Sequence, residues 1–260
     1  MGARGEATCS TVTSVEADYT ALARKLRTLA DHGVRAAFVR HTLMGMPPDQ
    51  VADLFTVAMS SAESRQPLHV ELLQSMSLAL ADEVCEALCD AVRRVLEARA
   101  QPTLAMALRR GKVEEEAETQ RIPDFGKGRT LTLGERKSVA RTTNRELITR
   151  VLRDPDPLVM RILLGNPLVT ETDLVRLCSR RPVSTEILRE VFRSVRWMVR
   201  YPVKVTLALN PYTPLDVGLQ IAPLLQGPDL RRVIATEHLH VALREACRRL
   251  MGRTESTTLH

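Results

Sequence analysis

The sequence predicts an all-α protein, built as an α-α superhelix of stacked helical repeats and preceded by an all-helical N-terminal region. Three observations lead to this fold class. Aromatic residues make up only 3% of the 260 residues, whereas β-sheets favour aromatic and β-branched side chains. Apolar residues recur at helical spacing along most of the chain. An Asn-Pro motif also occurs twice, at Asn166 and Asn210, 44 residues apart.

The N-terminal region spans residues 14–108 and follows a tail, residues 1–13, that we expect to be disordered. Thr13 and Glu16 have the spacing of a capping box, in which two side chains bond free backbone amides of the first helical turn. The apolar stripe of the first helix then consists of Tyr19, Leu22, Leu26 and Leu29. Further helices are expected over residues 34–44, 48–60, 67–80 and 82–99, and after Pro102.

Residues 109–130 interrupt the helical pattern. They are rich in charge, poor in large apolar residues, and contain Gly126 and Gly128 near their end. This composition is typical of an exposed linker. We therefore place a boundary here, with a helical-repeat domain over residues 131–252 and a second disordered tail over residues 253–260.

The repeat domain carries its own helix-start signals. Thr132 and Glu135 have capping-box spacing, and prolines fall in pairs 44 to 47 residues apart: Pro155 with Pro202, Pro167 with Pro211, and Pro182 with Pro228. Proline suits the first helical turn because its missing N–H has no partner there. The expected N-caps are Asp156, Thr170, Ser184 and Thr213. The pattern predicts two copies of a three-helix unit, near residues 154–196 and 200–250.

A repeat of this length with two or three helices is typical of HEAT and armadillo solenoids. The stretches "LLGNPLVTETDLVRL" and "LALNPYTPLDV", within residues 122–250, resemble a group of bacterial HEAT-like or leucine-rich-repeat-variant proteins that begin helices with Asn-Pro and Thr-Pro in the same way. The resemblance implies an α-α superhelix, a fold commonly used as a binding scaffold. It supplies no catalytic residues.

The five cysteines are odd in number and widely scattered, which argues against a disulfide framework and favours a reducing compartment. Cys85 and Cys89 are expected to share a helix face as buried free thiols. His238 and His240 lack the spacing for one helix face, so no metal and no cofactor are expected. The chain shows neither a secretory signal nor an apolar run of membrane-spanning length, so we expect a cytoplasmic protein.

Charge is distributed unevenly along the chain. From Arg129 to Arg253 there are 22 Lys and Arg against 12 Asp and Glu, which gives +10, whereas the remainder carries −4. Arginines at steps of 4, 3 and 4 would stack on one helix face beside the only Trp; the candidate binding residues are Arg189, Arg193, Arg196, Trp197 and Arg200. They could grip phosphates or an acidic protein surface. The alternative is a solvated face with Trp197 packed against the following repeat.

Three classes of function follow. The preferred one is a non-catalytic scaffold or adaptor that binds a protein partner through the repeat surface. The second is binding of nucleic acid or another polyanion by the basic C-terminal repeats. The third is a HEAT-like DNA base-excision enzyme, which would need a carboxylate close to Trp197. Because no nucleophile, base and acid stand at a recognisable spacing, we expect no enzyme.

Overall fold

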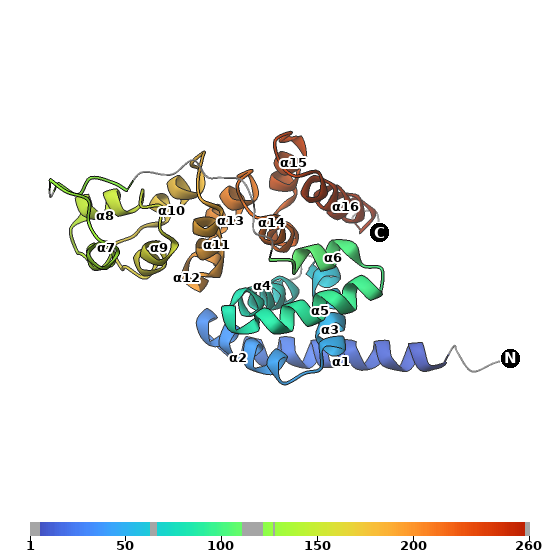
Figure 1. Cartoon of the computed structure of the whole chain (residues 1–260). Coiled ribbons are helices and arrows are strands. Elements are labelled where there is room, and N and C mark those ends of the chain that lie inside the picture. The colour runs from blue at the N-terminus through green and yellow to red at the C-terminus, as the bar shows by residue number, and fades with distance from the viewer. Residues whose placement is uncertain (1–5, 63–66, 111–121, 127, 258–260) are drawn as a thin grey trace.

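Every regular element is a helix in the part of the chain that the computed structural model describes, namely residues 6–62, 67–110, 122–126 and 128–257 (Figure 1). The all-α prediction is confirmed. In Figure 1 the N-terminal helices form a bundle, a run of later helices extends from it as an elongated arm, and the last helices return over the bundle.

The bundle consists of α1 to α6. The helices are α1 (Glu6–Arg27), α2 (His32–Met44), α3 (Pro48–Ser61), α4 (Pro67–Ala81), α5 (Glu86–Ala98) and α6 (Pro102–Ala107). The helices predicted over residues 34–44, 48–60 and 67–80 correspond to α2, α3 and α4. Large side chains from these helices are fully buried at the centre, among them Leu26, Leu43, Phe55, Leu72 and Leu96.

Two details of the N-terminal prediction are wrong. The first helix begins at Glu6, so Thr13 lies inside α1 and is not its cap. The helix expected over 82–99 is split into a 3-10 turn, η2 (Glu83–Cys85), and α5. The 3-10 turn begins after Asp82 because the Asp82 side chain accepts a hydrogen bond from the backbone N–H of Val84 and so caps η2.

The arm, defined as α7 to α13, is built from short helices. They are α7 (Leu133–Val139), α8 (Arg145–Val151), α9 (Pro157–Leu164), α10 (Glu171–Cys178), α11 (Thr185–Arg193), α12 (Val195–Met198) and α13 (Tyr201–Ala208). Four elements then return over the bundle: α14 (Leu215–Ile221), η3 (Ala222–Leu224), α15 (Gly227–Ala235) and α16 (Val241–Thr257). The inner end of the arm contacts the bundle where α11 meets α4 and α12 meets α2.

Four of the five predicted caps lie at helix starts in this half. The capping box of Thr132 and Glu135 is present at α7, and Asp156 and Thr170 cap α9 and α10. Ser184 occupies the N-cap position of α11 without a side-chain bond. Thr213 is not a cap, because its hydroxyl donates to the carbonyl of Leu207 instead and Pro214 precedes α14.

The two Asn-Pro motifs have the same structural role. In each, Oδ1 of the asparagine accepts a hydrogen bond of 2.9 Å from the backbone N–H two residues later, as expected for a turn. Each Nδ2 also donates to two backbone carbonyls at or just beyond the end of an earlier helix: Asn166 to Ala140 and Thr142, and Asn210 to Cys178 and Arg180. Both side chains are buried. The motif therefore recurs because each asparagine fastens its own turn to the end of a preceding helix.

The expected linker and second tail are each only partly described. Residues 111–121 and 258–260 lie outside the described part of the chain. Residues 122–126 contain no helix, but Phe125 and Leu131 are buried, so the end of the linker packs against the arm. The helix α16 extends to Thr257, into the segment where the second tail was expected.

Candidate binding site

The predicted arginine stripe does not form one helix face. The helix α11 ends at Arg193, Ser194 is extended with φ −79° and ψ 106°, and α12 begins at Val195. The direction of the chain changes at Ser194, so the side chains after Ser194 do not lie on the same helix face as those before it. The spacing prediction is wrong because it needed an uninterrupted helix from 184 to 200.

The first two arginines of the stripe form internal ion pairs. Arg189 is buried, and its Nη1 and Nη2 lie 2.6 and 3.2 Å from the two carboxylate oxygens of Asp216. This bidentate pair joins α11 to α14. Arg193 donates to the carboxylates of Glu190 at 2.7 Å and Glu83 at 3.0 Å, and to the carbonyl of Ala81 at 3.2 Å. Both side chains thus connect the arm to other parts of the fold.

The other three candidate residues, Trp197, Arg196 and Arg200, differ in their exposure to solvent. Trp197 is buried, and its Nε1 donates to the carbonyl of Leu164 at 2.9 Å. Arg196 is exposed but donates to the carbonyl of Asn166 at 2.9 Å while its guanidinium lies 4.5 Å from the Trp197 ring centre. Arg200 presents 59% of its side chain to solvent and lies 3.9 Å from Glu171. Trp197 is therefore buried within the fold, and its hydrogen bond goes to the preceding helix α9, whereas the alternative interpretation placed it against the following repeat.

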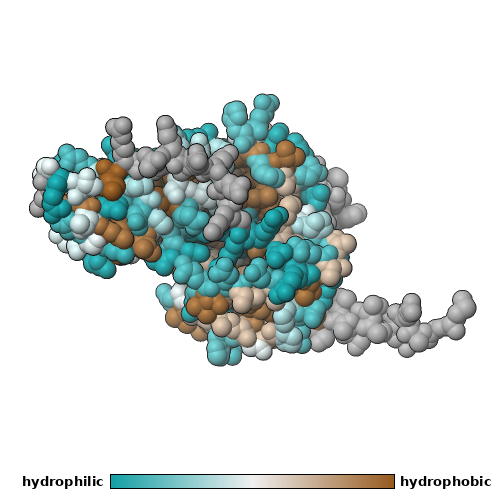
Figure 2. All heavy atoms as spheres, in the orientation of Figure 1, coloured by the Kyte–Doolittle hydropathy of each residue, from teal (hydrophilic) through white to brown (hydrophobic). Residues whose placement is uncertain are grey.

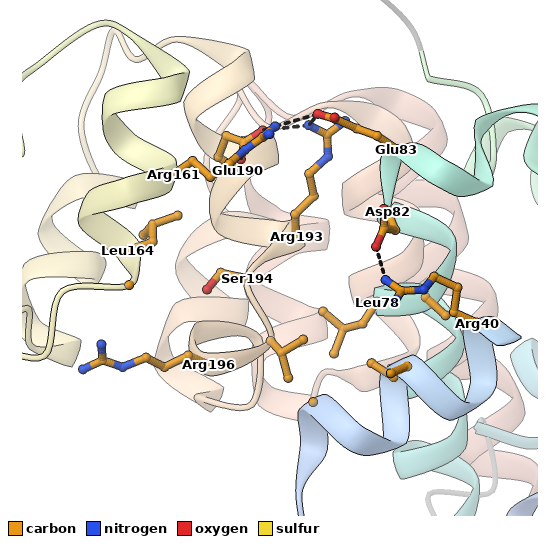
Figure 3. A pocket seen from close by; sticks show the side chains of 16 residues that line it. Arg40, Leu78, Asp82, Glu83, Arg161, Leu164, Glu190, Arg193, Ser194 and Arg196 are labelled. Carbon is orange, nitrogen blue, oxygen red and sulfur yellow. Dashed lines mark hydrogen bonds and ion pairs between the residues drawn. The ribbon is translucent and has the colours of Figure 1, made fainter. Parts of the chain in front are cut away.

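Several of these residues line a cleft between the bundle and the arm (Figure 3). The cleft has a volume of about 480 Å³. The bundle contributes α2, α4 and η2, and the arm contributes α9, α11 and α12. Its apolar lining consists of Gly33, Ala36, Ala37, Leu78, Ala79, Leu164, Gly165 and Val195, and its charged lining of Arg40, Asp82, Glu83, Arg161, Glu190, Arg193 and Arg196.

A network of four charged side chains closes one end of the cleft (Figure 3). Arg161 donates to Glu83 at 2.6 Å and to Glu190 at 2.7 Å, and Arg193 bonds the same two carboxylates. The hydrogen bond from Arg161 is the largest cause that lowers the pKa of Glu83, and the bond to Glu190 is the largest that raises the pKa of Arg161. Glu83 therefore stays ionised at neutral pH, and the network crosses from α9 and α11 to η2.

A second ion pair, between Arg40 of α2 and Asp82, lies on the bundle side of the cleft (Figure 3). The opposite end holds Arg196, whose donors are engaged by backbone carbonyls. The cleft thus presents a small-residue apolar surface between two charged ends. Sequence analysis named Arg193 and Arg196 but missed Glu83, Arg161 and Glu190, since no local pattern relates residues 78 positions apart, the separation of Glu83 and Arg161.

Other exposed apolar side chains do not gather into one alternative site. The large ones include Val34, Met44, Val84, Leu158 and Val241, which belong to four different elements. On the face drawn in Figure 2, hydrophobic residues occur in small groups among hydrophilic ones. The cleft is therefore the best-defined candidate for a binding site.

Four cysteines, Cys85, Cys89, Cys178 and Cys247, are buried free thiols, as the sequence predicts for Cys85 and Cys89. Burial raises the pKa of Cys89 to about 11 and that of Cys178 to about 12, so neither is a thiolate nucleophile at neutral pH. Among the described side chains, no three His, Cys, Asp or Glu residues converge as a metal-binding group. Within the same ranges, no helix has the length and apolar character needed to cross a bilayer.

Comparison with known proteins gives no match to the chain, whether with family models, curated proteins or solved structures. Function therefore has to be inferred from the geometry and chemistry of the cleft itself.

Proposed function

We propose that this protein is a non-catalytic helical-repeat adaptor that binds a partner protein in the cleft between α2 and α4 of the bundle and α9, α11 and α12 of the arm. The observation that carries this proposal is the composition of the cleft: an apolar surface of small residues flanked by charged side chains. Apolar contact supplies affinity at protein interfaces, whereas charged groups at the rim fix orientation and exclude wrong partners.

The size of the cleft suits part of a polypeptide. About 480 Å³ is within the range of roughly 300–1,000 Å³ found for ligand-binding clefts. Gly33, Ala36 and Ala37 on α2 lack long side chains, so a partner backbone can approach that helix closely. The partner would present one or two apolar side chains to this surface, with charged residues on either side to meet Glu83 or Arg196.

The same proposal includes a HEAT-like repeat architecture for the arm and a cytoplasmic location. Support for the repeats comes from Asn166 and Asn210, which stand 44 residues apart and each bond two carbonyls at or just beyond the end of an earlier helix. Stacked helical repeats usually serve as binding surfaces. Support for the location comes from the buried free thiols, which suit a reducing compartment.

Polyanion binding by the basic half is the second candidate function. One observation favours it: residues 129–253 carry a net charge of +10, against −4 for the rest of the chain. A region of excess positive charge attracts a polyanion. Retention on heparin with a steep salt dependence would support this function over the adaptor.

The adaptor proposal can be tested by site-specific photo-crosslinking. A photoreactive phenylalanine analogue at Ala37, an exposed residue that lines the cleft, should crosslink a partner protein in cells that produce this chain. The control position is Ala98, which is exposed on α5 and does not line the cleft. The same crosslinked protein from both positions would contradict a cleft-specific site.

The crosslinked partner should then be purified and titrated calorimetrically. Ala37→Trp fills the cleft from an exposed helix position and should weaken binding by at least about tenfold, the size of effect typical of a central interface residue. Ala98→Trp should bind as the wild type does. Equal affinity of wild type and Ala37→Trp would overturn the proposal.

A further inference from the structure

A second cavity lies where the last helices return over the bundle. It is formed by α3, α6, α14, η3 and α16, has a volume of about 270 Å³, and shares no lining residue with the binding cleft. Its walls are mainly apolar, with Met59, Leu104, Leu219, Pro223 and Leu250 contributing most of the large side chains. Cavities between packed helices that combine apolar walls with a few polar groups are typical small-molecule sites.

The polar groups of this cavity are few, and they include no acid among the described lining residues. Arg249 is the only charged residue among the described residues that line it, and three hydroxyl residues, Thr56, Ser60 and Thr103, accompany it. Nη1 of Arg249 lies 3.4 Å from Oγ1 of Thr103, which holds the guanidinium between α16 and α6. A positive charge therefore stands beside an apolar space that has no acidic lining residue in the described part of the chain.

The guanidinium of Arg249 is weakly neutralised. Its ion pair with Glu245 is stretched to 4.0 Å, and Arg248 holds the same carboxylate at 3.2 Å. The Arg249 side chain is 60% exposed. The long distance to its carboxylate distinguishes Arg249 from Arg189 and Arg193, whose carboxylate partners lie within hydrogen-bond distance. Arg249 can therefore offer its donors to an anion without breaking a close internal pair.

We infer that this cavity binds a small amphiphilic carboxylate, with its hydrocarbon part among Met59, Leu104, Leu219 and Leu250 and its carboxylate on Arg249. The volume lies just below the roughly 300–1,000 Å³ of most ligand sites, so the hydrocarbon part must be short. A guanidinium matches the two oxygens of a carboxylate, and the neighbouring hydroxyls can donate to it. A cationic ligand is disfavoured by Arg249, and a purely polar anion gains nothing from the apolar walls.

Octanoate and 1-octanol are suitable probes because they share a hydrocarbon chain and differ in the head group. Titration calorimetry of the full chain should give saturable binding of one octanoate, with a dissociation constant below about 1 mM, and weaker binding of octanol. Arg249→Gln should weaken octanoate binding by about tenfold and leave octanol binding unchanged. The matched control is Arg232→Gln on α15, a side chain that is also 60% exposed and lies outside the cavity lining, which should bind as the wild type does.

A filling variant separates the hydrocarbon site from the head-group site. Ser60 lines the cavity from an exposed position on α3, so Ser60→Trp should abolish binding of both probes while helical content, followed by circular dichroism, stays unchanged. No binding of octanoate to the wild type would overturn the inference. Equal losses in the Arg249 and Arg232 variants, or equal binding of the two probes, would remove the carboxylate assignment. None of these outcomes bears on the adaptor function, since the two sites share no residue.

Discussion

Lys204 offers the sharpest test of how burial and charge determine stability in this fold. It lies on α13, is 6% exposed, and its Nζ donates to Oε1 of Gln74 on α4 at 2.7 Å. No carboxylate pairs with it among the described ion pairs. Desolvation by burial lowers its pKa from 10.5 to about 8. The protein therefore holds a charged amine at neutral pH in a place that disfavours the charge.

The size of the effect follows from this pKa. A difference between 10.5 and about 8 corresponds to a destabilisation of about 3 kcal/mol at pH 7, at roughly 1.4 kcal/mol for each pKa unit. Lys204→Met removes the charge and keeps the length of the side chain, but leaves the amide oxygen of Gln74 without its donor, at a cost of about 1 kcal/mol. We expect the free energy of unfolding of the variant at pH 7 to exceed that of the wild type by about 2 kcal/mol, so the variant is the more stable protein.

The pH dependence has a defined sign. Below pH 8 the lysine is protonated in both the folded and the unfolded state, so the full destabilisation is present. As the pH rises from 8 towards 10.5, the folded protein loses the proton first, and the wild type recovers stability relative to the variant. The difference between the two proteins should therefore be largest at pH 7 and shrink by about 2 kcal/mol at pH 10.

Urea denaturation of both proteins at pH 7 and pH 10, followed by circular dichroism, measures this difference. Other titrating groups are common to both proteins and cancel. Lys137→Met on α7 is the control, since Lys137 is only partly buried and should change stability little at either pH. A Lys204→Met protein less stable than the wild type at pH 7, or a stability difference independent of pH, would refute the reasoning.

Two further predictions concern the contacts that hold the arm together. Asn166→Ala and Asn210→Ala each leave buried carbonyls without a donor and should lower the free energy of unfolding by similar amounts, about 2–3 kcal/mol in urea titrations. A cost below about 1 kcal/mol at either site would contradict the equivalence of the two motifs. Arg189→Met should cost about 3 kcal/mol because it leaves Asp216 buried and unpaired, and the double variant Arg189→Met with Asp216→Leu should regain most of it. Thermal unfolding of the wild type, the Arg189→Met variant and the double variant measures these differences in stability. A double variant that is less stable than Arg189→Met would contradict the prediction.

The success of sequence analysis depended on how local the relevant interactions are. Caps at Thr132, Asp156 and Thr170 were predictable because each side chain bonds an amide within three residues of its own position. The cap at Thr13 failed because α1 continues through it from Glu6. Local helix-start signals locate most helix starts here, but an apparent cap inside a longer helix cannot be recognised from its own residues.

The cleft could not be predicted, because its charged groups depend on tertiary contacts. Glu83 meets Arg161 and Arg193 only because η2 faces α9 and α11 in the folded chain. The same holds for Arg189, whose carboxylate partner lies 27 residues away on α14. A helical periodicity places an arginine on a face of its helix but does not say what lies opposite that face.

Several arginines of the arm and of the helices after it have a structural role, which the net charge of this half does not reveal. Guanidiniums bond backbone carbonyls at or just beyond helix ends: Arg180 bonds Leu152, Arg181 bonds Leu209, Arg196 bonds Asn166 and Arg244 bonds Ile234. The last carbonyls of a helix have no partner within it, and short helices leave many such groups for each turn they contain. Arginine suits this role because its long side chain carries five donors and can reach a neighbouring helix. The excess of positive charge in the C-terminal half therefore reflects in part how short helices are joined. Net charge is for this reason weak support for binding of a polyanion. The shape and lining of the cleft are the better guide to function.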